Sequence, residues 1–164
     1  MEKDVVALLE QAYDLCEDGQ YEDALKFYDK ALKKEPTNIK ALIDKATTLQ
    51  NLGRLKQSLR YYQKALEIDS HNTDALVNMG SSLHSMKKYG DAIALYDKAL
   101  KLDKKNAMAL AYKGLSLGEQ GKIQEAVKYF KQSLKIDSDY DLPRVSIEMA
   151  KEILRQLGKQ VKTQ

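Results

Sequence analysis

Apolar residues recur along this chain with the spacing of amphipathic helices, and the pattern starts again every 34 residues. In residues 39–72 a first apolar stripe comprises Leu42, Ile43, Ala46 and Leu49. A second stripe comprises Leu55, Leu59, Tyr62, Ala65, Leu66 and Ile68. Between them lies Gly53, which suits the end of a helix, and after them comes Asn72, which suits the start of the next one. The pattern therefore predicts two helices joined by a short turn, which makes them antiparallel neighbours.

The same two-helix unit occurs four times, in residues 5–38, 39–72, 73–106 and 107–140, with no insertion or deletion. Aromatic residues recur at one equivalent place, where we expect them to fill the seams between neighbouring repeats: Tyr28, Tyr62, Tyr96 and Phe130. Small residues recur at another place, where they allow two helices to approach closely: Ala12, Ala46, Gly80 and Gly114. A period of this length predicts stacked repeats, in which each unit buries its apolar face against its neighbours.

These features resemble the tetratricopeptide repeat, a helix-turn-helix of 34 residues with small residues at its eighth, twentieth and twenty-seventh places and an aromatic residue at its twenty-fourth. Pro36, at the thirty-second place, agrees with that family. Two features depart from it: leucine occupies the fourth place, where the family often has tryptophan, and Lys87 replaces the usual turn glycine. The resemblance implies an all-α fold, a right-handed α-solenoid of four helix-turn-helix repeats plus a C-terminal cap helix, within a single domain spanning residues 1–164.

Residues 141–162 stand outside the repeats, and we expect a cap helix at about 142–158. Pro143 follows Asp141 closely, as is common at the start of a helix. The apolar residues expected to pack on the last repeat are Val145, Ile147, Met149, Ile153, Leu154 and Leu157. Those expected to face water are Lys151, Glu152, Arg155 and Lys159. The alternative is an amphipathic helix that docks elsewhere.

Composition and charge narrow the class of protein. Hydrophobic residues make up 43% of the chain and charged residues 31%, so we expect a folded chain and not a disordered one. The net charge of +3 is too small to indicate nucleic-acid binding. Residues 5–38 carry eight acidic residues against four lysines, whereas each of the other repeats is mildly basic. This polarity indicates either an ordinary solvated surface or one that orients a partner or a second copy.

The cellular location and the absence of catalytic chemistry are predicted mainly because the sequence lacks the motifs typical of membrane, secreted and catalytic proteins. No apolar run approaches the roughly 18 residues of a membrane span, and the first residues lack a signal-peptide pattern. One cysteine cannot form an internal disulfide, so we expect a reducing, cytoplasmic location. Cys16, His71 and His84 show neither a metal-binding spacing nor a nucleophile–base pair. We therefore predict a protein that is not an enzyme and has no metal or cofactor, with Cys16 acting as a small hydrophobe.

The family resemblance implies a concave groove lined by the first helix of each repeat, with the second, fifth, ninth and twelfth places pointing inward. The fifth places hold apolar residues, for which the alternative role is to support helix packing. On this basis the predicted partner-binding residues are Leu9, Tyr13, Lys40, Ile43, Thr47, Asn78, Ser81 and Tyr112. The predicted function is a non-catalytic protein–protein interaction scaffold that holds a peptide or helix of a partner. The alternative is a homo-oligomeric self-assembly module.

Two more specific partners are not supported by the sequence. Relatives that grip the acidic tails of chaperones place Lys, Asn and Arg around the ligand carboxylates, and of the matching places here only Asn78 fits. Pentatricopeptide proteins, which bind RNA, use units of 35 residues and basic surfaces, whereas this chain has a period of 34 and an acidic first repeat. We therefore expect neither a carboxylate clamp for chaperone tails, nor nucleic acid, nor a membrane as the partner.

Overall fold

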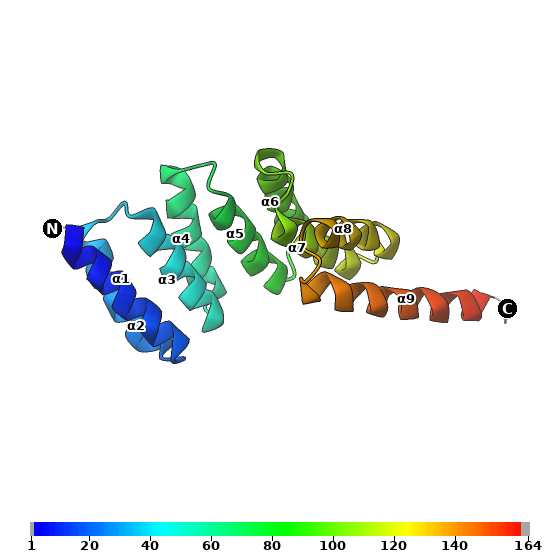
Figure 1. Ribbon diagram of the computed structural model, residues 1–164, viewed down its shortest axis with the longest axis horizontal. Coiled ribbons are helices and arrows are strands. Elements are labelled where there is room, and N and C mark those ends of the chain that lie inside the picture. The colour runs from blue at the N-terminus through cyan, green and yellow to red at the C-terminus, as the bar shows by residue number, and fades with distance from the viewer. Residues whose placement is uncertain (1, 162–164) are drawn as a thin grey trace. The chain divides into compact units, whose positions relative to one another are not determined.

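The computed structural model describes residues 2–161, and within that range the chain forms nine α-helices and no β-strand (Figure 1). The helices are α1 (Glu2–Glu17), α2 (Tyr21–Lys34), α3 (Ile39–Asn51), α4 (Leu55–Ile68), α5 (Thr73–Ser85), α6 (Tyr89–Leu102), α7 (Ala107–Glu119), α8 (Ile123–Ile136) and α9 (Asp141–Val161). Side chains are described from residue 4 to residue 156. The predicted two-helix periodicity is thus present, because each predicted repeat contains one pair of helices.

The chain divides into two compact units, Met1–Met86 with helices α1 to α5 and Lys87–Gln164 with helices α6 to α9. In the first unit each helix packs on the next along the chain, and α3 also contacts α5. In the second unit α6 packs on α7, α7 on α8, and α9 on both α8 and α7. The single domain and the boundaries of the four repeats stay predictions.

The predicted seam aromatics are buried in both units. Tyr28 and Tyr62 have 2% and 0% of their surface exposed in the first unit, and Tyr96 and Phe130 have 0% and 3% in the second. Around Tyr28 the core of α1, α2 and the start of α3 comprises Val5, Leu9, Ala12, Ala24, Ala31 and Ala41. Burial of side chains of this size is the main favourable term for folding.

Small residues allow the close helix packing that the repeat pattern predicts. A Cβ atom added to Gly114 on α7 would lie 2.5 Å from Cε1 of Phe130 on α8, well inside van der Waals contact. The ring of Phe130 therefore lies directly against the α7 backbone. Alanine occupies the equivalent place at Ala12 and Ala46, and both side chains are fully buried.

Asparagine side chains cap three of the first helices. The Oδ1 atoms of Asn38, Asn72 and Asn106 accept hydrogen bonds at 2.9, 2.9 and 2.8 Å from backbone N–H groups three residues later. Each bond satisfies one of the donors that a helix N-terminus leaves without an intrahelical partner. The capping role predicted for Asn72 is confirmed.

Lys87 occupies a turn where the other repeats use glycine, and replacing it with glycine is expected to stabilise the protein. Its φ is 61°, and the equivalent Gly19, Gly53 and Gly121 have φ of 72°, 71° and 78°. A left-handed conformation costs a residue with a side chain about 1–2 kcal/mol, and the larger unfolded-state entropy of glycine offsets part of that. We expect Lys87→Gly to raise the free energy of unfolding by about 0.5–1 kcal/mol in urea titrations. The reverse change at the equivalent turn, Gly53→Lys, should lower it by a similar amount, and equal stability of all three proteins would contradict the prediction.

The C-terminal helix α9 buries only part of the apolar surface that was expected to pack on the last repeat. Pro143, Ile147 and Ala150 are buried against the rest of the second unit. Four of the residues expected to pack on the last repeat keep a large exposed fraction, namely Val145 (57%), Met149 (63%), Ile153 (41%) and Leu154 (37%). Val145 is thus mostly exposed, whereas Met149 and Ile153 still line a pocket together with residues of α7 and α8, and Leu154 lines a hollow beside Ile123 of α8. Lys151, Glu152 and Arg155 face water as predicted, and the side chains of Leu157 and Lys159 lie outside the described residues.

Candidate functional site

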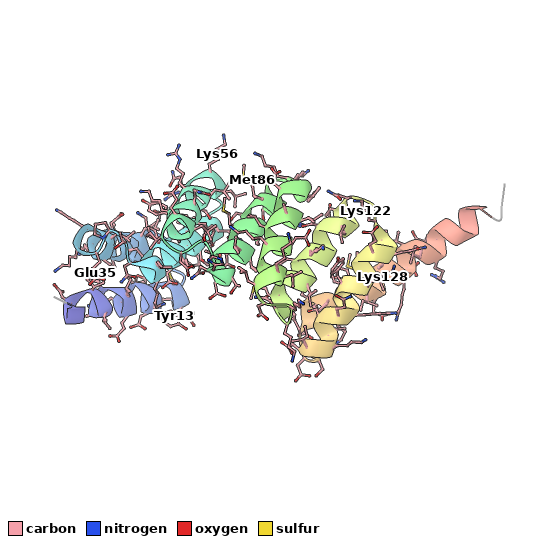
Figure 2. The ribbon with its side chains drawn as sticks, turned by 90° about the horizontal axis from the view of Figure 1, so that it is seen from above. Tyr13, Glu35, Lys56, Met86, Lys122 and Lys128 are labelled. Carbon is pink, nitrogen blue, oxygen red and sulfur yellow. The ribbon has the colours of Figure 1, made fainter. Side chains whose placement is uncertain are left out.

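Seven of the eight predicted partner-binding residues lie on α1, α3 and α5 of the first unit, and Tyr112 lies on α7 of the second. Tyr13, labelled in Figure 2, is 57% exposed on α1. On α3, Lys40 is exposed and forms an ion pair with Asp44 at 2.7 Å, and Ile43 is half-buried. Asn78 on α5 is also half-buried. These side chains are accessible, as a binding role requires.

Leu9 differs from the other predicted residues because it is 9% exposed and belongs to the core around Tyr28. The equivalent Val77 and Ala111 are 2% and 0% exposed. At these three positions the apolar residue of the fifth place supports helix packing, the alternative that the sequence left open. Only Ile43, among the four fifth-place residues, keeps an accessible side chain.

Two predicted residues, Thr47 and Ser81, are joined by a hydrogen-bond network. The Thr47 Oγ1 atom lies 2.9 Å from the Tyr62 hydroxyl, which donates to Oε1 of Gln50 at 3.2 Å. Gln50 Oε1 also accepts from the Ser82 hydroxyl at 2.9 Å, while Nε2 of Gln50 donates to Ser81 Oγ at 3.1 Å. The network therefore links α3, α4 and α5 through one amide group.

Gln50 is the residue that the list of predicted site residues missed. The sequence did indicate Gln50, because it occupies the twelfth place of its repeat, which is one of the four places expected to point into the groove. The buried Tyr62 hydroxyl was missed as well, because its ring was assigned to the core. Its hydroxyl is protonated at neutral pH and acts as a donor, and burial raises the pKa of Tyr62 further, from 10.0 to about 12.

A buried lysine in each unit was also missed. Lys45 on α3 is 6% exposed and forms an ion pair with Asp29 on α2, and its Nζ donates to the Tyr61 hydroxyl on α4 at 2.6 Å. The ammonium group also lies 4.1 Å from the centre of the Tyr61 ring. Burial lowers the pKa of Lys45, but the hydrogen bonds from its ammonium group to Asp29 and Tyr61 outweigh burial and raise it overall.

The second unit repeats this arrangement at equivalent places. Lys113 on α7, 9% exposed, contacts Asp97 on α6 at 2.5 Å and the Tyr129 hydroxyl on α8 at 2.7 Å. Hydrogen bonds from the ammonium group to Asp97 and Tyr129 again outweigh burial and raise the pKa of Lys113. Each lysine bridges three consecutive helices, so we assign both a structural role. The signal in the sequence was the joint recurrence of lysine, aspartate and tyrosine two repeats apart, with Met79 in place of lysine between them.

Tyr112 and Cys16 are held by neighbouring aromatic or hydroxyl groups. The Tyr112 ring stacks on Tyr96, with ring centroids 6.2 Å apart and planes inclined by 17°. The half-buried Cys16 Sγ lies 3.4 Å from Thr48 Oγ1 and 3.8 Å from the Tyr28 hydroxyl. In residues 2–161 no cluster of three or more His, Cys, Asp and Glu side chains is placed to hold a metal ion.

Across the part of the chain that the structure describes, none of the helices combines the length and the apolar character needed to cross a membrane.

Consecutive pairs of helices with a fixed period, asparagine caps and aromatic seams define a helical-repeat protein. Comparison with protein families identifies the repeat: residues 8–112 match the family model described as Psidin, N-terminal TPR repeats region, and residues 109–140 match the tetratricopeptide repeat model. The chain belongs to the tetratricopeptide repeat family. The resemblance stated from the sequence is therefore confirmed.

Solved structures of tetratricopeptide repeat proteins share the fold. PilF of Pseudomonas aeruginosa superposes with a TM-score of 0.85 at 24% identity, over 94% of this chain and 71% of PilF. MamA gives a TM-score of 0.78 at 21% identity, over 99% of this chain and 88% of MamA. The first repeat domain of Spaghetti (RPAP3), bound to the HSP90 peptide SRMEEVD, gives 0.68 at 19% identity, over 71% of this chain and 93% of that domain. These likenesses confirm the all-α solenoid fold class, and among curated protein sequences none matches this chain.

Proposed function

We propose that this chain is a non-catalytic scaffold that binds a peptide or a helix of a partner protein on the face of α1, α3 and α5. Membership of the tetratricopeptide repeat family supports a protein–protein interaction scaffold in general, and proteins of this family are generally non-enzymatic. The proposed site, which we call the α1–α3–α5 face, comprises Tyr13, Lys40, Ile43, Thr47, Asn78 and Ser81.

The observation that carries the proposal is the network of Thr47, Tyr62, Gln50 and Ser81. Its hydrogen bonds hold side chains of three helices in fixed positions before any partner arrives. Side chains that are already ordered lose little conformational entropy on binding, so more of the contact energy contributes to affinity. Tyr13 on α1 and Ile43 on α3 add accessible apolar contact area. The combination suits a segment with apolar side chains and free backbone polar groups.

The proposed partner is not an acidic tail of the kind bound by the Spaghetti (RPAP3) domain. At the places where a carboxylate clamp needs Lys, Asn, Asn, Lys and Arg, counting from the first repeat gives Leu9, Tyr13, Asp44, Asp74 and Asn78. Counting from the second repeat gives Ile43, Thr47, Asn78, Met108 and Tyr112, of which only Asn78 matches. Neither set supplies a basic residue, and the two aspartates of the first set repel carboxylates instead of binding them. We propose a partner segment without a cluster of acidic residues.

The test begins with affinity capture by wild type and by the Tyr13→Ala/Asn78→Ala double variant, followed by peptide binding. Overlapping synthetic peptides from a captured partner would then be titrated by fluorescence anisotropy. Truncating an exposed tyrosine and an amide at an interface removes contact area and hydrogen bonds, so we expect the Kd to rise at least about tenfold, which is about 1.4 kcal/mol.

A matched control changes two exposed lysines on the second helices, Lys33→Ala/Lys56→Ala, and should bind like wild type. Lys56 lies on the side of the first unit opposite Tyr13 in the view of Figure 2. Light scattering after size exclusion should give a monomer for all three proteins. Unchanged peptide binding by the Tyr13→Ala/Asn78→Ala variant, or a stable dimer at micromolar concentration, would count against the proposal and favour self-assembly.

A further inference from the structure

A pocket in the second unit lies between α7, α8 and α9 and has a volume of about 160 Å³. Its wall is mainly apolar, with Leu115, Gly118, Ala126, Phe130, Met149 and Ile153 among the lining residues. An apolar cavity of roughly 150 Å³ is large enough to hold benzene. The pocket therefore has room for one leucine, methionine or phenylalanine side chain.

Gly118 lines the pocket and has no side chain that could occupy it. The equivalent place in the other repeats carries Cys16, Gln50 and His84. A Cβ atom added to Gly118 would meet only the Cβ of Ala126, at an ordinary contact distance of 3.9 Å, so close packing does not require glycine here. Glycine inside a helix lowers stability relative to alanine. Close packing of α7 on α8 therefore does not explain the glycine at this place.

Exposed apolar side chains on α9 extend the pocket outward. Val145, Met149 and Ile153 follow each other at intervals of four residues, so they lie on one side of the helix, and we call them the α9 stripe. They are 57%, 63% and 41% exposed, and Met149 and Ile153 also line the pocket. Contiguous apolar surface of this kind indicates an interaction site.

The charges nearest to the α9 stripe are negative. With 3.6 residues per turn, Glu152 lies about 80° and Glu148 about 120° around the helix from the middle of Met149 and Ile153, whereas Arg155 lies about 140° and Lys151 about 180° away. Glu119 on α7 lines the pocket itself, and its Oε2 accepts one hydrogen bond, from the Tyr89 hydroxyl at 3.2 Å. Glu148 and Glu152 pair with Lys151 and Arg155 at 2.7 and 2.8 Å, but all four side chains are largely exposed. Exposed pairs contribute little to stability, so these carboxylates remain able to pair with a partner.

We propose that the pocket and the α9 stripe form a second docking surface, for a basic amphipathic helix of a partner protein. One apolar side chain of that helix enters the space over Gly118, and a lysine or arginine within one turn of it pairs with Glu119 or Glu152. A helix suits the surface because the stripe runs about 12 Å along α9, roughly two helical turns. A second copy of this chain suits it less well, because two such surfaces would bring their carboxylates together.

The test is a selection from a displayed library of 16-residue helical peptides, with wild type as target and the Gly118→Leu variant for counter-selection. The added side chain fills the pocket, and the open space around Gly118 allows the variant to fold. Enriched peptides are expected to carry one large apolar residue with Lys or Arg three or four positions away. Their Kd is expected to rise at least about tenfold on Gly118→Leu and on Glu119→Lys/Glu152→Lys.

Gly90→Leu is the matched control, because Gly90 is exposed on α6 and a Cβ there meets nothing within 4 Å. It should bind the selected peptides like wild type, and so should Tyr13→Ala/Asn78→Ala, which separates this surface from the α1–α3–α5 face. In spectra of ¹³C-methyl methionine, the Met149 signal should move when peptide is added. The proposal is overturned if no peptide is enriched, if enriched peptides are acidic or bind Gly118→Leu equally well, or if light scattering shows a dimer that Gly118→Leu abolishes.

Discussion

Replacing Tyr62 with alanine is expected to lower the free energy of unfolding by about 3–5 kcal/mol, the range for truncating a large aromatic side chain in a core. Tyr62 has 0% of its surface exposed, so the change leaves a cavity among α3, α4 and α5. It also leaves Gln50 Oε1 without the donor at 3.2 Å. Since folded domains are stable by about 5–15 kcal/mol, the variant should be close to unfolding. Urea titration followed by circular dichroism at 222 nm measures the change.

Two further variants separate the contributions at this position. Tyr62→Phe keeps the ring and removes only the hydroxyl, so the expected cost is about 1 kcal/mol. Tyr13→Ala removes the same kind of side chain from an exposed site and should change stability by less than about 0.5 kcal/mol. If Tyr62→Ala proved as stable as Tyr13→Ala, the seam role of the aromatic place would be wrong.

The second large expected effect is a loss of stability at alkaline pH. Burial raises the pKa of Tyr62 to about 12, and it also raises the pKa of Tyr28 and of Tyr96. In the unfolded chain tyrosines lose their protons near pH 10, whereas the folded chain still holds these protons. The unfolded state therefore binds fewer protons than the folded state, so stability is complete below about pH 10 and falls as pH rises further.

For Tyr62 alone the loss is about 2 kcal/mol by pH 12. The raised pKa of Lys45 and of Lys113 acts in the same direction, because the unfolded chain loses those protons first. Urea titrations at pH 9 and at successive values up to pH 12 measure the decline, and absorbance at 295 nm reports tyrosine ionisation. Tyr62→Phe should show a shallower decline than wild type. Ionisation of all ten tyrosines near pH 10 with helicity intact would contradict the prediction.

Much of the local structure could be predicted from sequence because it depends on residues close together in the chain. The helix end expected near Gly53 agrees with the end of α3 at Asn51 and with the positive φ of Gly53. The cap at Asn72 involves a backbone N–H group only three residues away. The recurrence of Tyr28 and Tyr62 at one place in the repeat indicated burial. A residue at the centre of an apolar stripe faces the neighbouring helix even if the position of that helix is not known in detail.

The candidate site was predictable only in part. Tyr13 and Asn78 are accessible as expected, whereas Leu9 is buried, because the fifth place lies at the border between the core and the surface. At such a border the outcome depends on how near the next helix lies. The same reason explains α9, where Ile147 is covered and Met149 is exposed although both are apolar and two residues apart.

By itself, the sequence determined the helices, their turns and caps, the aromatic seams and the family, since each rests on periodicity or on contacts within a few residues. Only the tertiary structure decided that Lys45 is buried between Asp29 and Tyr61, that Gln50 and Tyr62 link Thr47 to Ser81, and that Gly118 and Met149 line one pocket. Each of these depends on side chains from different helices meeting at distances of a few ångströms. Whether a polar group is buried, or a glycine leaves free space, depends on how side chains of different helices pack together. It does not follow from the position of one residue in its own helix.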